Sequence, residues 1–437
     1  MPVNERGLRR RALVAGGALA LTGLLGAFAP HSEAATADPA APAAPAAPAH
    51  ATLPAPTGPY AVGTTTRHLV DASREDPWHP GRGHREVGVS FWYPAAGGEA
   101  GTAQRTAPHM EARAAGHFGS ATGAGALNYG VPAGAADWAS TRTHARVDAP
   151  AARGAGTRPV VLYSAGLGDP RTWNTSLVED LASRGYVVVT VDHTYDSSEV
   201  ALSGGRLATS VLPELAAKPG TDIDAVLRTA MRARVEDARF VLDTLGSAGR
   251  RPALPPHLAD AMDLRRVGMV GHSAGGFAAV QTMHDDRRVK AAVNMDGTME
   301  FPAPDSSGSR LGTAARDGVD RPFLLMGTDA ADSGPYDRQP SWKALWEHSR
   351  GWRGNVTLTG SQHGTYTDAA PLLPQLARQG ALPWETVRKN VGTVEPRRAV
   401  AATRAYVASF FDRFLRGRDD HLLDGPSQRF PEMRHAR

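Results

Sequence analysis

Short apolar runs of the kind found in buried strands alternate with helix-like segments over most of the chain. The apolar runs cover residues 87–93, 159–164, 186–191, 267–270, 289–295, 321–327 and 355–360. The helix-like segments cover residues 172–183, 222–245, 276–283, 341–348 and 398–415. Alternation of strands and helices requires crossover connections, and these place strands in parallel and cover both faces of the sheet. We therefore predict an α/β fold with a mostly parallel central sheet flanked by helices.

The pentapeptide Gly271-His272-Ser273-Ala274-Gly275 lies between one of these strands and the helix that follows it. A G-x-S-x-G sequence in this setting is typical of the nucleophile elbow, a sharp turn that lifts the serine hydroxyl above the sheet. Glycine on either side leaves the room that such a turn needs. The alternative is a glycine-rich turn with an ordinary serine, but the strand before and the helix after it favour a nucleophile at Ser273.

Four polar residues follow the carboxyl ends of predicted parallel strands, where the sites of such sheets gather: Ser273, Asp296, Asp329 and His363. A serine nucleophile needs a base, usually histidine, and an acid that orients the base. His363 follows the last sheet strand, so we predict it as the base. The acid is Asp296 or Asp329, and strand spacing alone slightly favours Asp329.

A serine nucleophile of this type also needs two N–H groups to bind the oxyanion that forms on the substrate. The residue after the nucleophile supplies one of them, which predicts the Ala274 amide. The other comes from the loop after the strand at 159–164, where Gly166 and Gly168 stand. The same glycines would suit a plain turn.

The N-terminal residues carry the features of an export signal followed by a spacer. Arg9-Arg10-Arg11 precedes a weakly apolar run at residues 12–29 and then small residues, which is the order of a secretory signal peptide of twin-arginine type. A single membrane anchor is the alternative. Residues 38–58 are rich in Pro and Ala, a composition typical of an extended linker. We assign 1–37 to the signal, 38–58 to the linker and 59–437 to one catalytic domain with an irregular insertion near 94–157.

Composition narrows the function further. The chain has no cysteine, so neither a disulfide nor a lipid-acylated cysteine is available, and we expect a protein exported in folded form. The net charge is +4, of which residues 1–37 carry +2, and the remaining +2 does not indicate nucleic-acid binding. Asp192-His193 has no third ligand at metal-type spacing, and phosphate-loop or dinucleotide-binding motifs do not occur. We therefore predict no metal and no cofactor.

Several separated motifs resemble the secreted platelet-activating factor acetylhydrolase family and the related bacterial lipases. They extend over residues 85–370: Phe91-Trp92-Tyr93-Pro94, Ser164-Ala165-Gly166-Leu167-Gly168, Leu181-Ala182-Ser183-Arg184-Gly185-Tyr186, Val191-Asp192-His193, the elbow at 271–276, Asp296, Phe301-Pro302 and Gly360-Ser361-Gln362-His363. The resemblance implies the α/β-hydrolase fold, Asp296 as the acid and the Leu167 amide as the second oxyanion donor. The chain departs from the family at Ala165, where the family usually has histidine.

The resemblance also implies the substrate class, which is lipid esters: short acyl groups at the sn-2 position of phospholipids, or triacylglycerols. Our sequence-based hypothesis is a secreted serine hydrolase that cleaves small ester or phospholipid substrates through an acyl-Ser273 intermediate and makes transient contact with a lipid interface. Two alternatives remain open. One is a cutinase-like polyester esterase or general carboxylesterase, and the other is a non-catalytic binding protein that keeps the fold.

Overall fold

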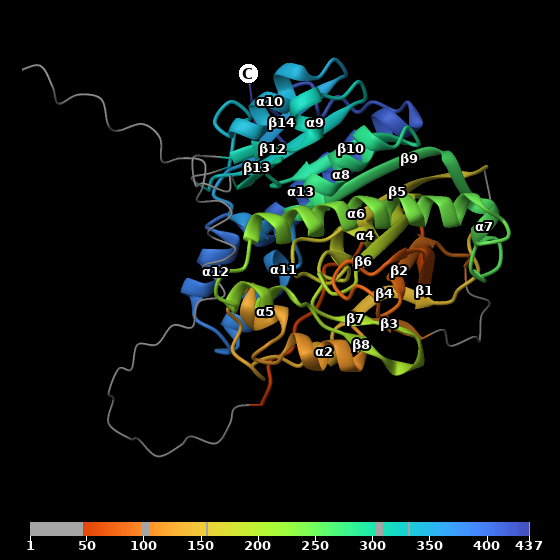
Figure 1. Cartoon of the computed structure of the whole chain (residues 1–437). Helices are drawn as coiled ribbons and strands as arrows, with labels where there is room; N and C mark the ends of the chain where they lie inside the picture. The colour runs from red at the N-terminus through yellow and green to blue at the C-terminus, as the bar shows by residue number, and fades with distance from the viewer. Residues whose placement is uncertain (1–46, 98–104, 154–155, 303–308, 331–332, 437) are drawn as a thin grey trace, which may run out of the picture.

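A computed structural model describes residues 47–97, 105–153, 156–302, 309–330 and 333–436. In these residues an eleven-stranded sheet crosses the molecule in the order β15-β14-β13-β10-β9-β5-β6-β2-β1-β4-β3 (Figure 1). Its six central strands are parallel: β14 (Arg353–Leu358), β13 (Phe323–Thr328), β10 (Val289–Met295), β9 (Met262–His272), β5 (Arg158–Ser164) and β6 (Val187–His193). Each of them overlaps one of the predicted apolar runs. The predicted α/β class with a mostly parallel sheet is confirmed.

Antiparallel strands extend the sheet at both edges. Beyond β6 lie β2 (His84–Pro94), β1 (Val62–Glu75), β4 (Arg142–Val147) and β3 (Thr106–Pro108), and β15 (Met433–His435) lies beyond β14. The β1–β4 pair alone among these is parallel. Two small hairpins lie outside the sheet: β7 (Val200–Ala201) with β8 (Leu207–Ala208), and β11 (Glu300–Pro302) with β12 (Ser309–Leu311).

Alternate residues of each central strand point to opposite faces of the sheet. Both faces are apolar, and helices pack on each of them. Val160 and Leu162 of β5 belong to a core with α6 (Ile223–Gly246), α7 (Leu258–Ala261), α8 (Ala274–Asp285), α9 (Thr313–Asp317) and α10 (Pro340–His348). Val161 and Tyr163 belong to a second core with α4 (Thr175–Ser183) and α13 (Pro396–Arg416). The central strands are buried on both faces, which explains why they appear in the sequence as continuous apolar runs rather than alternating ones.

The described part of the insertion near 94–157 is more regular than we expected. It holds β3, α2 (Ala112–Phe118), α3 (Ala124–Leu127), η1 (Trp138–Ser140) and β4. Its apolar side chains form a third core with α11 (Ala369–Arg378) and α12 (Trp384–Val391). The expectation of an irregular segment was wrong because partners more than 200 residues away in the sequence stabilise these short elements. The remaining elements are η2 (Ser203–Gly205), α5 (Leu212–Ala217) and η3 (His363–Tyr366).

The folded body begins earlier than residue 59. Ala49, Ala51 and Leu53 are buried in the third core, and the His50 and Thr52 amides donate to the side chains of Gln379, directly after α11, and of Gln375 within it. We call residues 49–57 the N-terminal strap. The boundary that we placed at 59 is thus too late, because proline and alanine also suit a segment packed in extended form on a helix. The signal peptide predicted at 1–37 lies outside the described residues. No helix in the described ranges has the length and apolar character needed to cross a bilayer.

The order of the strands places two loops side by side. From β5 the chain proceeds through α4 to β6 on one side, whereas β9 and then β10 lie on the other side of β5. The chain therefore leaves β5 and β9 toward opposite edges of the sheet, and the point between two such strands is where parallel sheets characteristically bind ligands. In register, Ser164 at the end of β5 pairs with Gly271 near the end of β9. The predicted elbow and the predicted oxyanion loop meet at this point.

Candidate active site

Ser273 lies in a sharp, strained turn between β9 and α8. Its φ of 56° and ψ of −122° fall outside the regions that L-residues ordinarily adopt, and strain of this kind persists only where the surroundings enforce it. The neighbouring glycines show what enforces it. A Cβ on Gly275 would lie 2.0 Å from the carbonyl oxygen of Ser164, and one on Gly271 would lie 2.2 Å from the backbone of Gly275. Only glycine allows the elbow to pack this closely against the end of β5.

Asp296 and His363 form a hydrogen bond beside this turn. Asp296 directly follows β10, and its carboxylate oxygen lies 2.6 Å from Nδ1 of His363, at the start of η3. The hydroxyl groups of Thr328 and Ser333 also donate to this carboxylate. Burial disfavours the ionised form, but the hydrogen bond and charge of His363, together with the Ser333 hydroxyl, outweigh it and hold the pKa of Asp296 below its usual value. Asp296 is therefore an ionised acceptor for the imidazole.

Asp329, the acid that strand spacing slightly favoured, has other partners. One of its carboxylate oxygens accepts a hydrogen bond from the Gly360 amide at 2.6 Å, and the other pairs with the guanidinium group of Arg434. Asp329 thus fastens the turn after β14, which leads to His363. Of the two candidate acids, the structure brings Asp296 to the imidazole.

His272, inside the elbow, contacts the His363 loop. Its Nε2 lies 2.8 Å from the carbonyl oxygen of His363, and the two rings are 4.5 Å apart. Burial and the nearby charge of His363 lower the pKa of His272 to about 3, so the ring stays neutral and donates its Nε2 proton to that carbonyl. Sequence reasoning missed this anchor, because the pattern G-x-S-x-G leaves the residue at this position unspecified.

The neutral state of His272 predicts a pH dependence of stability. The unfolded chain binds a proton at this histidine below pH 6.5, and the folded chain only near pH 3, so the free energy of unfolding falls as the pH drops through this window. At pH 5 the loss is about 2 kcal/mol relative to pH 7.5. We expect His272→Gln to remove about this much of the pH dependence in urea denaturation at the two pH values. His84→Gln, at an exposed position, should leave the wild-type dependence intact, and equal slopes for His272→Gln and wild type would contradict the prediction.

The loop after β5, residues 165–169, lies against the elbow and carries the predicted oxyanion donor Leu167. Leu167 and Ala274 are both partly exposed, although the residues on either side of each are buried. Both side chains pack on the same core. The two predicted donors therefore belong to neighbouring turns that open to the outside. The buried Arg234 of α6 bonds the carbonyl groups of this loop, a contact that the sequence did not reveal.

The insertion reaches the same loop through Asp169. Its carboxylate accepts hydrogen bonds at 2.8 Å from the amide of Asn128 and from the hydroxyl of Tyr129, both directly after α3. Burial raises the pKa of Asp169 to about 6. Asn390 of α12 in turn donates to the Tyr129 carbonyl. The insertion, the loop at residues 165–169 and α12 are thus joined by hydrogen bonds.

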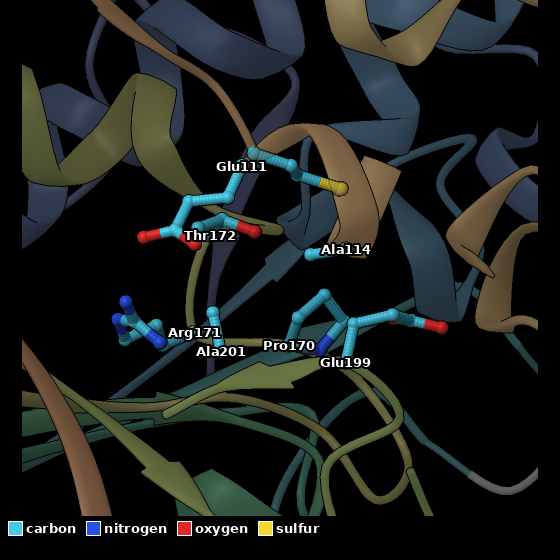
Figure 2. Close-up of a pocket in the computed structure, with 8 residues that line it drawn as sticks. Glu111, Ala114, Pro170, Arg171, Thr172, Glu199 and Ala201 are labelled. Carbon is cyan, nitrogen blue, oxygen red and sulfur yellow. The ribbon is translucent and has the colours of Figure 1, made fainter. Parts of the chain in front are cut away.

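A pocket lies immediately beyond this loop (Figure 2). It is lined from α2, from the loop after Asp169 and from the loop after β6 by Met110, Glu111, Ala114, Pro170, Arg171, Thr172, Glu199 and Ala201. Figure 2 shows the Glu111 and Thr172 side chains across the opening from Arg171. Ser273 does not line this pocket.

Two groups with metal-type residues have protein partners. Asp192 pairs with the guanidinium group of Arg171, and His193 lies between Ser164 and Asp237, so both side chains of this dipeptide have structural partners. Among the described residues, one cluster has the spacing of a metal site: Asp419, His421 and Asp424. It is exposed, and the guanidinium group of Arg413 pairs with both of its aspartates. It lies outside the catalytic candidates.

Known proteins resemble this chain over much of its length. The family model of platelet-activating factor acetylhydrolase, isoform II, matches residues 46–204, a segment that ends before Ser273. A probable 1-alkyl-2-acetylglycerophosphocholine esterase of Arthroderma benhamiae is 27% identical over 280 residues, which are 63% of this chain and 65% of that protein. The platelet-activating factor acetylhydrolase of Canis lupus familiaris is 27% identical over 170 residues, 35% of this chain and 38% of the dog enzyme. These alignments span less than two thirds of either relative.

A solved structure matches more completely. The ferulic acid esterase from Streptomyces cinnamoneus is 37% identical, with a TM-score of 0.70, and the match covers 89% of this chain and 99% of that one. Fold, family model and relatives agree with the motifs found in the sequence. This chain belongs to the ester hydrolases of the α/β-hydrolase fold, and it is similar to the platelet-activating factor acetylhydrolases over part of its length.

Proposed function

We propose that this protein hydrolyses carboxylic esters through an acyl-enzyme intermediate on Ser273. The observation that carries the proposal is the 2.6 Å contact between His363 Nδ1 and the ionised Asp296, next to a serine held in a strained elbow. A carboxylate at Nδ1 keeps the other ring nitrogen, Nε2, unprotonated and able to accept the serine proton. The same carboxylate stabilises the imidazolium that then forms.

The reaction has two halves, and in each half His363 accepts one proton and then donates it. His363 takes the proton from the Ser273 hydroxyl as the oxygen attacks the ester carbonyl, and the amides of Ala274 and Leu167 bind the resulting oxyanion. His363 then gives the proton to the departing alcohol. In the second half it deprotonates water, which attacks the acyl-serine, and it then returns this proton to the Ser273 oxygen as the bond to the acyl group breaks and the carboxylic acid leaves. The residues needed for this sequence all belong to the chain.

The substrate proposed first is a phospholipid with a short acyl ester, since the family model and the curated relatives are named for such esters. Esters of aromatic acids are the second candidate, because the relative with 37% identity is a ferulic acid esterase. Among the described residues, the large hydrophobic side chains that are exposed are Tyr60, Val70 and Trp384. They lie far apart in the sequence, and three such side chains supply little apolar surface for a lipid layer, which favours esters taken from solution over esters in a lipid surface.

Export in folded form is also part of the proposal. It rests on the twin-arginine pattern at residues 9–14 and on the absence of cysteine from the chain. Arg10→Lys together with Arg11→Lys should keep the protein inside expressing bacteria, whereas the wild type is recovered outside the cytoplasm. Recovery of the double variant outside the cytoplasm would contradict this route.

A labelling experiment with a substrate panel tests the activity. A fluorophosphonate probe should label the wild type and not Ser273→Ala, and the panel should contain an acetylated lysophospholipid, tributyrin, a feruloyl ester and a polyester film. We expect fastest turnover of the acetylated lysophospholipid. Faster turnover of the feruloyl ester would instead assign the enzyme to esters of aromatic acids, and faster turnover of the film would assign it to polyesters. A wild-type chain that stays unlabelled beside a reactive control hydrolase would identify a binding protein instead.

A further inference from the structure

Arg234 is a fully buried arginine whose hydrogen bonds converge on the loop after β5. From the middle of α6 it donates to the carbonyl oxygen of Ala165 at 2.5 Å and to that of Gly166 at 2.9 Å. Its charge is balanced by Asp196, which accepts from Nε and Nη2 at 2.7 Å each. We propose that Arg234 and Asp196 are positioning residues for catalysis, which orient the Leu167 N–H toward the oxyanion. This inference rests on the proposed function and extends it.

The geometry of the peptide group supplies the first reason. The peptide unit between Gly166 and Leu167 is planar and trans, so its C=O and N–H point in opposite directions. Arg234 and the Asp169 amide both donate to the Gly166 carbonyl, which directs that carbonyl into the protein. The Leu167 N–H, at the other end of the same unit, must then point away from Arg234. Rotation of this unit would break a charge-assisted hydrogen bond with a buried guanidinium group.

Asp196 holds the other side of Leu167. Its carboxylate accepts a hydrogen bond at 3.2 Å from the Gly168 amide, and the Gly168 carbonyl accepts one from the Ser198 amide. The backbone groups on either side of Leu167 are therefore hydrogen-bonded to Arg234, to Asp196 or to the nearby Ser198 amide. Ala165 has no polar side chain, so support for this loop has to come from another element, and α6 supplies it.

A buried Ser-His-Asp chain extends the same support to the end of β5. The Ser164 hydroxyl lies 2.9 Å from Nε2 of His193, and Nδ1 of His193 lies 3.0 Å from Asp237. Arg234 also donates to this hydroxyl, at 3.3 Å. The three members of the chain are at most 1% exposed, so no substrate reaches them. This second set has the residue types of a catalytic triad, but its position allows only a structural role.

The proposed role predicts a specific kinetic signature. Negative charge on the carbonyl oxygen develops after substrate binding, so an oxyanion donor stabilises the transition state more than the bound substrate. A misplaced donor should therefore lower kcat and leave KM nearly unchanged. A defect in folding alone would lower the fraction of active enzyme, which active-site titration with the fluorophosphonate probe measures directly.

Arg234→Lys tests the inference in the full-length protein. Lysine keeps the charge but cannot bond Asp196 and two carbonyls in one plane. We expect kcat per titrated site for p-nitrophenyl acetate to fall at least about tenfold, with KM changed less than about threefold. Inhibition by a trifluoromethyl ketone, which binds as a tetrahedral oxyanion, should weaken by the same factor as kcat.

Arg404→Lys is the matched control. Arg404 is also buried and also bonds backbone carbonyl groups, those of Ser176, Pro54 and Ala55, but on the α13 side of the sheet. We expect it to lower Tm and to leave kcat per titrated site unchanged. Asp196→Asn, which weakens the same ion pair with little change of size, should act like Arg234→Lys and serves if that variant does not fold.

The outcomes separate the two proposals. An active wild type with unchanged kcat in Arg234→Lys or Asp196→Asn would overturn the positioning role alone. Equal losses of kcat in Arg234→Lys and Arg404→Lys would also overturn the positioning role. A wild type that neither turns over esters nor reacts with the probe would overturn both the proposed function and this inference.

Discussion

Asp296→Asn should lower kcat for ester hydrolysis by about 10⁴-fold, whereas Asp329→Asn should lower it by less than about tenfold. The structure gives the reason for the difference. Asp296 accepts a hydrogen bond from His363 Nδ1, and an amide at this place can donate to Nδ1 instead, which stabilises the tautomer that cannot accept the serine proton. Asp329 contacts the Gly360 amide and Arg434. Asp329→Asn should therefore only weaken the contacts that hold the turn after β14 in place.

Initial rates with p-nitrophenyl acetate, normalised to protein of unchanged circular dichroism, measure this difference. Thr328→Val is a useful control, because it removes one hydroxyl donor to Asp296 but leaves the carboxylate and its bond to His363. We expect it to reduce kcat far less than Asp296→Asn does. Loss of turnover in Asp329→Asn combined with near-normal turnover in Asp296→Asn would show that the acid has been assigned to the wrong residue.

Asp237→Ala should lower the free energy of unfolding by roughly 3–5 kcal/mol, because it removes the fully buried one of the two carboxylates that pair with the buried guanidinium group of Arg85. Asp237 lies fully buried on α6 and accepts from Arg85 at 3.1 and 2.8 Å, and also from Arg74 and His193. Burial opposes its ionisation, but Arg85 and the hydrogen bond from His193 outweigh burial and hold the pKa of Asp237 far below its usual value. Arg85 is itself 0% exposed, and Asp76 would remain as its carboxylate partner.

Urea denaturation of the variant and of Asp263→Ala compares an ion pair whose arginine is buried with one whose arginines reach the solvent. Asp263 pairs with Arg265 and Arg266, whose side chains are 88% and 37% exposed, so its removal should cost less than about 1 kcal/mol. A loss from Asp237→Ala no larger than that from Asp263→Ala would mean that water or a rearranged Asp76 compensates Arg85.

The strands and helices of the body were predictable because they are long and because burial on both faces makes the strands continuously apolar. The insertion was not predictable for the opposite reason. Its strands and helices have three to seven residues, and Phe118 and Trp138 are stabilised by Trp173 from beyond β5 rather than by a periodic pattern of their own. No local rule reveals a contact between segments this far apart.

The candidate site was predictable as far as chain order and strand ends determine it. Ser273 and His363 follow from these rules, but the choice between Asp296 and Asp329 does not, because both aspartates follow a parallel strand. Family resemblance separated them, and the structure adds the hydrogen bond. Arg234 was not predictable, since α6 carries several arginines and the helical period cannot tell a solvated one from one that donates to a loop.

The N-terminal strap has a consequence for the order in which the protein can be made. The His50 amide bonds Gln379 and the Thr52 amide bonds Gln375, while Arg404 bonds the carbonyl groups of Pro54 and Ala55. These contacts join residues more than 300 positions apart, so the strap cannot dock until almost the whole chain has left the ribosome. The segment that emerges early therefore completes the fold last, and until then α11 and α13 lack part of their covering. A chain truncated before residue 375 would keep the N-terminal strap and lose the surface on which the strap docks.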